Sequence, residues 1–407
     1  MVLADRVLAQ EMNPASMFLM NLASGTSANP AAWPMPMIMR HYGKWNAMFM
    51  STGFLSEIQQ SGPRGGDKLY STNWFMASAE HRAGSGGAFQ AELMLSFDPA
   101  TTTGRRYPLL FQTGETAYGL PLQDAQHPHN FIMSLGFHYT RQLTSGGAML
   151  DLYFAPVGDP ALGPVAFPHR ASAIELPQAP ISHHWQDSTH IADEVVTVGV
   201  RFRQIKLEAS GFHGAEPGEN RWTIGSGPLD SWSARLWYFP SRNWAAQVSL
   251  GRIVHPEALE PGDQTRVTAS LAYTRAVPGG NWSSTVVWGR THSTATFRNL
   301  NSYLVESVFP VSRKNFLTGR WELVDKDELF RNQPDLEERL TTLYGSTFRI
   351  EAYTAGYTRD VEIFRHAQTG FGANFTAYSL PAAIKPYSGV YPVGVNLFVR
   401  FRLRRGS

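Results

Sequence analysis

Histidine is concentrated in one part of the chain, because eight of the 13 histidines lie between His127 and His213. His183, Asp187 and His190 stand at i, i+4 and i+7, so a helical segment would place two imidazoles and one carboxylate on one face. Imidazole and carboxylate together suit Zn, Cu, Ni or non-haem Fe. The sequence therefore predicts a candidate metal site made of His127, His129, His169, His183, His184, Asp187 and His190. Alternatively, these side chains form the hydrogen bonds that fold two long loops.

Methionine is distributed even more unevenly, since all 13 methionines lie within the first 149 residues. The densest runs are Met35–Met39 (MPMIM) and Met48–Met50. Thioethers are soft ligands that select Cu(I), so copper handling is one interpretation. The other is that the methionines are adaptable apolar fillers. A divalent metal or copper is the one cofactor that the sequence predicts.

The same histidine-rich stretch contains the residue types of a hydrolase. Ser182 and Ser188 are candidate nucleophiles, beside His183 and His190 as bases and Asp187 as the orienting group. The chain has no G-x-S-x-G turn, however, and closeness in sequence does not place a hydroxyl on an imidazole. We predict no catalytic residues, and a membrane-barrel hydrolase remains an alternative.

Composition restricts the class of protein that could position these residues. Only 17% of the 407 residues are charged, against ~25% in soluble proteins, while aromatic residues reach 12%. The net charge of +2 is dispersed, which excludes a nucleic-acid partner. The absence of cysteine excludes disulfides and thiolate metal sites. No apolar run approaches the ~18 residues of a spanning helix, which excludes an α-helical membrane protein.

Strict alternation of polar and apolar residues dominates the chain from Lys44 onward. In the last segment the odd positions from Val395 to Leu403 are apolar, whereas Arg400 and Arg402 lie between them. This is the pattern of strands with one apolar face, and each segment has roughly the ~9–11 residues of a tilted membrane strand. About sixteen such segments are predicted: Lys44–Leu55, Lys68–Glu80, Gly87–Phe97, Asn130–Arg141, Gly147–Ala155, Glu194–Phe202, Ile205–Gly214, Asp230–Phe239, Trp244–Ile253, Gln264–Arg275, Asn281–Thr291, Leu300–Phe309, Asn315–Val324, Gly345–Asp360, Phe364–Ala377 and Val393–Arg404.

The connections between these segments alternate in length. Arg203-Gln204 and Ala276 to Gly280 are short, whereas Asp98 to His129 and Pro156 to Asp193 are long. Alternation of this kind is typical of a transmembrane antiparallel β-barrel with short periplasmic turns and long extracellular loops. The fold class is therefore all-β, with a single barrel of about 16 strands over residues 44–404 and a periplasmic lead-in or plug over residues 1–43. A soluble all-β protein is the alternative.

Three stretches resemble outer-membrane porins of Gram-negative bacteria, and more narrowly an uncharacterised acidobacterial-type outer-membrane family: Pro121–Gly136, Pro160–Ile191 and Glu322–Phe330. The resemblance implies a barrel in the outer membrane but brings no established activity. Such barrels usually end on an aromatic residue, whereas this chain ends at Arg404-Arg405-Gly406-Ser407. At the other end of the chain, the apolar run within Met1–Gln10 is too short for a signal peptide.

The polar strand face should line the lumen. The predicted lining residues are Arg201, Arg203, Arg235, Arg266, Arg320, Glu322, Arg349, Glu351, Arg400 and Arg402. Unpaired, these arginines would favour anions; paired with carboxylates, they would be structural struts. We therefore predict a passive channel for small polar or anionic solutes, with outer-membrane metal handling and a hydrolase as alternatives. The expected partners are membrane lipid, lipopolysaccharide, the barrel-assembly machinery and a second and third copy in a homotrimer.

Overall fold

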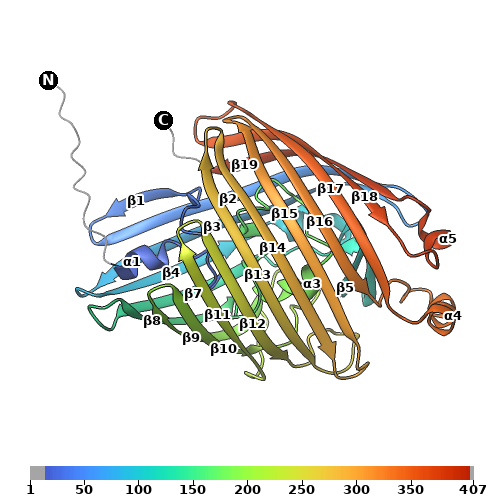
Figure 1. Ribbon diagram of the computed structural model, residues 1–407, viewed down its shortest axis with the longest axis horizontal. Helices are drawn as coiled ribbons and strands as arrows, with labels where there is room; N and C mark the ends of the chain where they lie inside the picture. The colour runs from blue at the N-terminus through green and yellow to red at the C-terminus, as the bar shows by residue number, and fades with distance from the viewer. Residues whose placement is uncertain (1–13, 404–407) are drawn as a thin grey trace.

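The chain forms a closed barrel in the computed structural model, which describes residues 14–403. Each wall strand pairs antiparallel with the next, and β19 pairs with β2 to close the ring (Figure 1). Within the described residues the sixteen wall strands are β2 (Trp45–Gln60), β3 (Asp67–Ala83), β4 (Gly87–Leu95), β7 (Ile132–Gln142), β8 (Ala148–Gly158), β9 (Ala192–Phe202), β10 (Ile205–His213), β11 (Ser231–Ser241), β12 (Trp244–Ile253), β13 (Gln264–Val277), β14 (Gly280–Ser293), β15 (Asn299–Ser312), β16 (Asn315–Lys326), β17 (Phe348–Val361), β18 (Ala367–Ser379) and β19 (Val393–Leu403).

The predicted sixteen-strand antiparallel barrel is confirmed, and each predicted segment overlaps one wall strand. Residues 1–13 and Arg404, which belong to the predicted lead-in and last strand, lie outside the described residues. The links also alternate as predicted: Arg203 and Gln204 join β9 to β10, whereas residues 159–191 join β8 to β9. We call the two ends of the barrel the short-turn end and the long-loop end.

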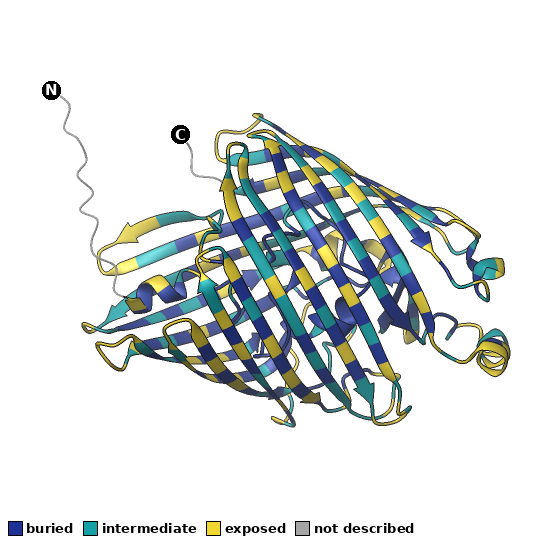
Figure 2. Ribbon diagram, viewed as in Figure 1, coloured by how far each residue is buried: buried dark blue, intermediate teal, exposed yellow. Residues whose placement is uncertain are grey.

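Exposure alternates along most of the wall strands, as the striped ribbons of Figure 2 show. In β19, Leu397 is 54% exposed on the outside, while its neighbours Asn396 and Phe398 are buried on the inside. The apolar side chains of the alternating pattern therefore face outward around the wall, and most polar side chains face the lumen. This is the reverse of a soluble barrel, whose apolar side chains fill its interior.

Several short elements lie off the wall. Strand β1 (Ile38–Tyr42) extends the sheet by pairing with the start of β2, and β5 (Tyr107–Ala117) and β6 (Leu120–Gln126) form a separate hairpin. Tyr118 and Gly119 both have positive φ, which suits the tight turn of that hairpin. The helices are α1 (Pro14–Leu19), α2 (Asp98–Thr101), α3 (His183–Gln186), α4 (Pro334–Tyr344) and α5 (Lys385–Ser388), with single 3₁₀ turns at Thr103–Arg105, Phe167–His169 and Ser188–His190. None of the described helices has the length and apolar content needed to cross a bilayer.

Candidate functional site

The long connection over residues 159–191, which we call the lumen loop, folds into the barrel. None of its residues is exposed. It leaves from β8 and returns to β9, yet the Trp185 indole donates a hydrogen bond to the Asp325 carbonyl of β16 (2.9 Å). In the order of pairing, β16 stands eight strands from β8 in the ring of sixteen. The lumen loop therefore crosses the full width of the barrel.

Buried ion pairs hold the lumen loop to the wall. Arg170 of the loop contacts Asp187 (2.5 Å), also in the loop, and Glu306 of β15 (3.2 Å). Arg320 of β16 binds the other oxygen of Glu306 at 3.0 Å. The Arg170 guanidinium and the His183 ring hold the pKa of the Asp187 carboxyl well below its usual range, despite burial. Because burying a charge is costly, each of these groups depends on its partner.

A second set of buried charges holds the middle of the lumen loop. The Glu175 carboxylate binds the guanidinium of Arg400 and, at 3.4 Å, that of Arg402, both on β19. Arg400 also pairs with Asp360 of β17. The geometry thus matches the alternative in which lumen arginines pair with carboxylates.

The N-terminal segment, residues 14–37, reaches inside the short-turn end of the barrel. The Ser16 hydroxyl donates to Glu80 (2.6 Å), and the Ser24 hydroxyl donates to Asp159 at the base of the lumen loop (2.8 Å). Asn29 bonds the backbone of the same loop through both atoms of its amide. Gly25 has φ +49°, and a Cβ there would lie 2.3 Å from the Asp159 carbonyl. Glycine is therefore required where this segment meets the loop.

The structure separates the predicted lining residues into two groups. Six of them are buried on the inner face: Arg235, Arg266, Arg320, Glu322, Arg400 and Arg402. Arg201 is also on the inner face, half-buried. The other three predicted lining residues do not face the lumen, which corrects the prediction. Arg203 lies in an exposed turn with φ +55°, and Arg349 and Glu351 are on the outer face of β17.

The reason for the outer position of Arg349 and Glu351 is local packing. Phe348 and Ile350 alternate with them and join a buried apolar cluster that includes Phe330, inside the long-loop end. The inner face of β17 is thus apolar at this level, and the charged residues turn outward. A period of two shows that two faces exist, but it does not say which one points inward.

A cavity of about 260 Å³ opens between the N-terminal segment and the wall at the short-turn end. Arg201, Lys206 and Arg242 line it, together with aromatic residues Phe18 and Phe239. Lys206 is paired with Asp151 and Glu208, but Arg201 and Arg242 have no ion-pair partner among residues 14–403. Arg201 instead lies over the rings of Phe18 and Phe239. The cavity therefore carries unpaired positive charge.

The predicted metal ligands come close together without forming one ligand shell. The rings of His183 and His190 are 5.2 Å apart, and those of His129 and His190 are 5.6 Å apart. Several ring nitrogens are already engaged: His129 with Asp98 (2.8 Å), and His183 with Asp187 (2.7 Å).

Two further predicted histidines, His127 and His169, are also held by neighbours. His127 contacts Glu115 at 2.9 Å, and His169 packs against the Trp74 ring. Burial lowers the pKa of His127 to about 4 and that of His169 to about 3, so both are neutral near pH 7.

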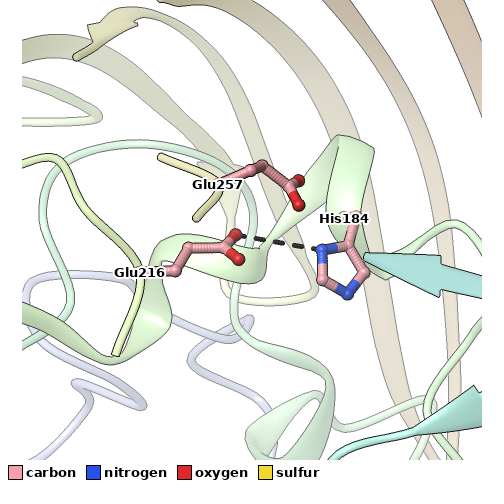
Figure 3. A group of neighbouring side chains, drawn as sticks. All are labelled: His184, Glu216 and Glu257. Atoms are coloured by element: carbon pink, nitrogen blue, oxygen red, sulfur yellow. Dashed lines mark ion pairs between the residues drawn. The ribbon is translucent and has the colours of Figure 1, made fainter. Parts of the chain in front are cut away.

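One group in the described part of the chain does bring three ligand atoms within 4.8 Å of one another: His184, Glu216 and Glu257 (Figure 3). Only His184 was among the predicted ligands. Glu216 lies between β10 and β11, and Glu257 lies between β12 and β13. No spacing in the sequence joins these three loops, so only the fold could bring them together.

The methionines form a ladder on the inner face of neighbouring strands. Met50 of β2 stands opposite Met76 of β3, which stands opposite Met94 of β4. All three are buried, with Met133 and the half-buried Met35 packed in the same cluster. This packing is typical of methionines that fill gaps in an apolar core, and copper binding stays a prediction.

Neither predicted nucleophile forms the contact with histidine that a serine hydrolase needs. The Ser182 hydroxyl donates to Glu322 (2.9 Å), and the Ser188 hydroxyl accepts from Arg266 (2.9 Å). Neither serine has a hydrogen bond to an imidazole in the described residues, so neither predicted nucleophile is paired with a histidine base.

Comparison with known proteins finds similarity only in structure. No protein-family model matches the chain, and no curated protein matches it. Among solved structures, the anion-selective porin from Comamonas acidovorans is 11% identical, with a TM-score of 0.51 over 88% of this chain and 99% of that chain. OprB of Pseudomonas putida is 8% identical, with a TM-score of 0.54 over 88% of this chain and 94% of its own.

The outer-membrane channel DcaP of Acinetobacter baumannii is likewise 8% identical, with a TM-score of 0.53 over 89% of this chain and 99% of its own. The chain therefore has the closed sixteen-strand barrel fold of outer-membrane porins. The narrower resemblance to an acidobacterial-type family stays a prediction.

Proposed function

We propose that the protein is a Gram-negative outer-membrane channel for small anionic or polar solutes, narrowed by the lumen loop. The observation that carries this proposal is the closed barrel with an apolar outside and a polar, charged inside. Such a wall satisfies its backbone hydrogen bonds within the sheet and presents side chains suited to lipid. The short-turn end would then face the periplasm, and the long-loop end would face the exterior.

The preference for anions is supported by the cavity at the short-turn end. Arg201 and Arg242 line it without ion-pair partners among the described residues, and low-dielectric walls focus their field. Elsewhere in the lumen several positive side chains are paired with carboxylates, as Arg235 is with Glu208 (2.7 Å), whereas the buried Arg266 and Lys326 have no ion-pair partner among the described residues. The cavity at the short-turn end is therefore one expected source of anion selectivity.

The width of the path is set by the lumen loop and the N-terminal segment. Both are fixed by buried polar contacts, so neither is expected to leave the lumen freely. Small solutes are thus favoured over large ones. Lipid and lipopolysaccharide would contact the outer face. Association into a homotrimer is part of the proposal, and light scattering of the detergent-solubilised protein should then give three chains per particle.

The test is a reversal-potential measurement in planar bilayers across a KCl gradient kept at or below 0.1 M, where the Debye length is still ~10 Å. The wild type should conduct and should select chloride. Arg201→Gln should move the reversal potential toward zero. Arg203→Gln, in the exposed turn two residues away, is the matched control and should behave as the wild type. A folded protein without conductance would overturn the proposal.

A further inference from the structure

His184, in helix α3 of the lumen loop, is a buried imidazole without hydrogen bonds. Its side chain is 2% exposed, and neither ring nitrogen has a hydrogen-bond partner. Oε1 of Glu216 lies 3.8 Å from its Nδ1. An unsatisfied buried polar group costs about 1–3 kcal/mol, so its presence calls for an explanation.

Two carboxylates face this imidazole from other loops (Figure 3). Oε2 of Glu216 also lacks a hydrogen-bond partner. The backbone N–H of Glu216 donates to the Pro256 carbonyl (2.9 Å), which ties the two loops and sets Glu216 beside Glu257. Among the described residues neither carboxylate forms an ion pair with an arginine or lysine, and the guanidinium of Arg266 donates instead to Ser188 and Gln264. Two carboxylates and one imidazole thus converge without a cationic side chain bound to them.

We propose that His184, Glu216 and Glu257 bind a divalent transition metal of the Zn²⁺ or Mn²⁺ type. One imidazole nitrogen and two carboxylates suit these ions, whereas Ca²⁺ and Mg²⁺ prefer oxygen ligands alone. The three ligand atoms lie within 4.8 Å of one another. Side-chain movement of roughly an ångström brings them to the bond lengths of ~2.0–2.2 Å that Zn²⁺ requires. A water molecule would take the fourth position.

The surroundings of the site favour a structural role for the ion. The β5–β6 hairpin covers His184 closely, because a Cβ on Gly114 would lie 2.6 Å from the imidazole ring. The Glu115 N–H of the same hairpin donates to Glu257 (3.3 Å). His184 belongs to the lumen loop, whereas Glu216 and Glu257 belong to loops at the long-loop end. A bound ion would therefore fasten the lumen loop to the mouth of the barrel.

The test is metal binding to the full-length protein in detergent, after treatment with a chelator. Isothermal titration should give one Zn²⁺ per chain, with no comparable binding of Ca²⁺. Glu257→Gln and Glu216→Gln keep the side-chain shape and should each weaken Zn²⁺ binding by at least ~100-fold. Changing a residue that only supports a metal ligand lowers metal affinity by up to ~100-fold, and loss of a ligand should cost at least as much. His255→Gln is the matched control, since His255 is exposed and lies in the same loop as Glu257.

Heat-modifiable mobility on gels shows whether each variant is folded, and either folded Gln variant is sufficient for the test. Absence of Zn²⁺ and Mn²⁺ binding to the wild type would overturn the proposal. So would wild-type affinity in a folded Glu257→Gln or Glu216→Gln protein, or loss of binding in His255→Gln. The titration does not depend on conductance, so its outcome is independent of the channel proposal.

Discussion

Replacing Glu175 by glutamine should release the lumen loop from β19. The carboxylate of Glu175 is the loop's partner for both Arg400 and Arg402, and all three side chains are buried. Removing one partner of a buried ion pair costs ~3–5 kcal/mol. Arg400 keeps Asp360 in the variant, so we take the lower end, about 3 kcal/mol. At 1.4 kcal/mol per tenfold change, the undocked population should rise by roughly 100-fold.

Trypsin reports this population directly. Arg170 is the single lysine or arginine between Asp159 and Ile191, and it is buried while the loop is docked. When docking is faster than cleavage, the rate of cleavage after Arg170 follows the undocked fraction. Mass spectrometry of the two fragments should therefore show much faster cleavage in Glu175→Gln than in the wild type.

The matched control is Glu362→Gln at the short-turn end. Glu362 pairs with Lys314 at 3.1 Å, and both side chains are more than half exposed, so the pair should contribute little. Its cleavage rate should stay near that of the wild type. If folded Glu175→Gln is cleaved no faster than the control and shows the same current noise in bilayers, Glu175 does not anchor the loop.

Three further predictions concern other contacts. Burial raises the pKa of Asp159 to about 8, above its value of ~3.9 in the unfolded chain. The free energy that the neutral carboxyl contributes to folding is fully present below the unfolded pKa and is lost as the pH rises through 8. Asp159→Asn should therefore reduce the fall in melting temperature between pH 5 and pH 9, measured by tryptophan fluorescence. Met76→Leu conserves the side-chain volume and should lower the unfolding free energy by less than ~1.5 kcal/mol. If the ladder binds copper, the same change should weaken the binding of Ag⁺, and an unchanged affinity for Ag⁺ would contradict copper binding. Gly114→Ala, at φ +104° and against the His184 ring, should weaken Zn²⁺ binding in the titration described above.

The barrel was predictable because its signal is repeated sixteen times. Each wall strand has one face toward the outside and one toward the lumen, so alternation is enforced along its length, and the loop lengths sort by end. The β5–β6 hairpin was missed because residues with positive φ, including Phe111 and Asp124, interrupt its alternation. The orientation of Arg349 was missed because it depends on apolar packing inside the long-loop end.

The site was predictable only in part. The histidine-rich stretch was recognised, and the structure does place it in the lumen. Asp187 was predicted as a metal ligand, yet its oxygens are used by Arg170, His183 and a backbone N–H. Glu216 and Glu257 were missed because loops that are distant in sequence meet only after the barrel closes. Residue type and local spacing carry no information about such contacts.

Single-channel conductance of a variant without the lumen loop tests the central claim most directly. Residues 164–186 would be replaced by a short Gly-Ser linker, leaving the ends of β8 and β9 intact. We expect the wild type to conduct with a small unitary current and the variant to conduct with a clearly larger one, because the loop crosses the whole lumen. Equal conductance of the two folded proteins, or none in either, would contradict a channel narrowed by this loop.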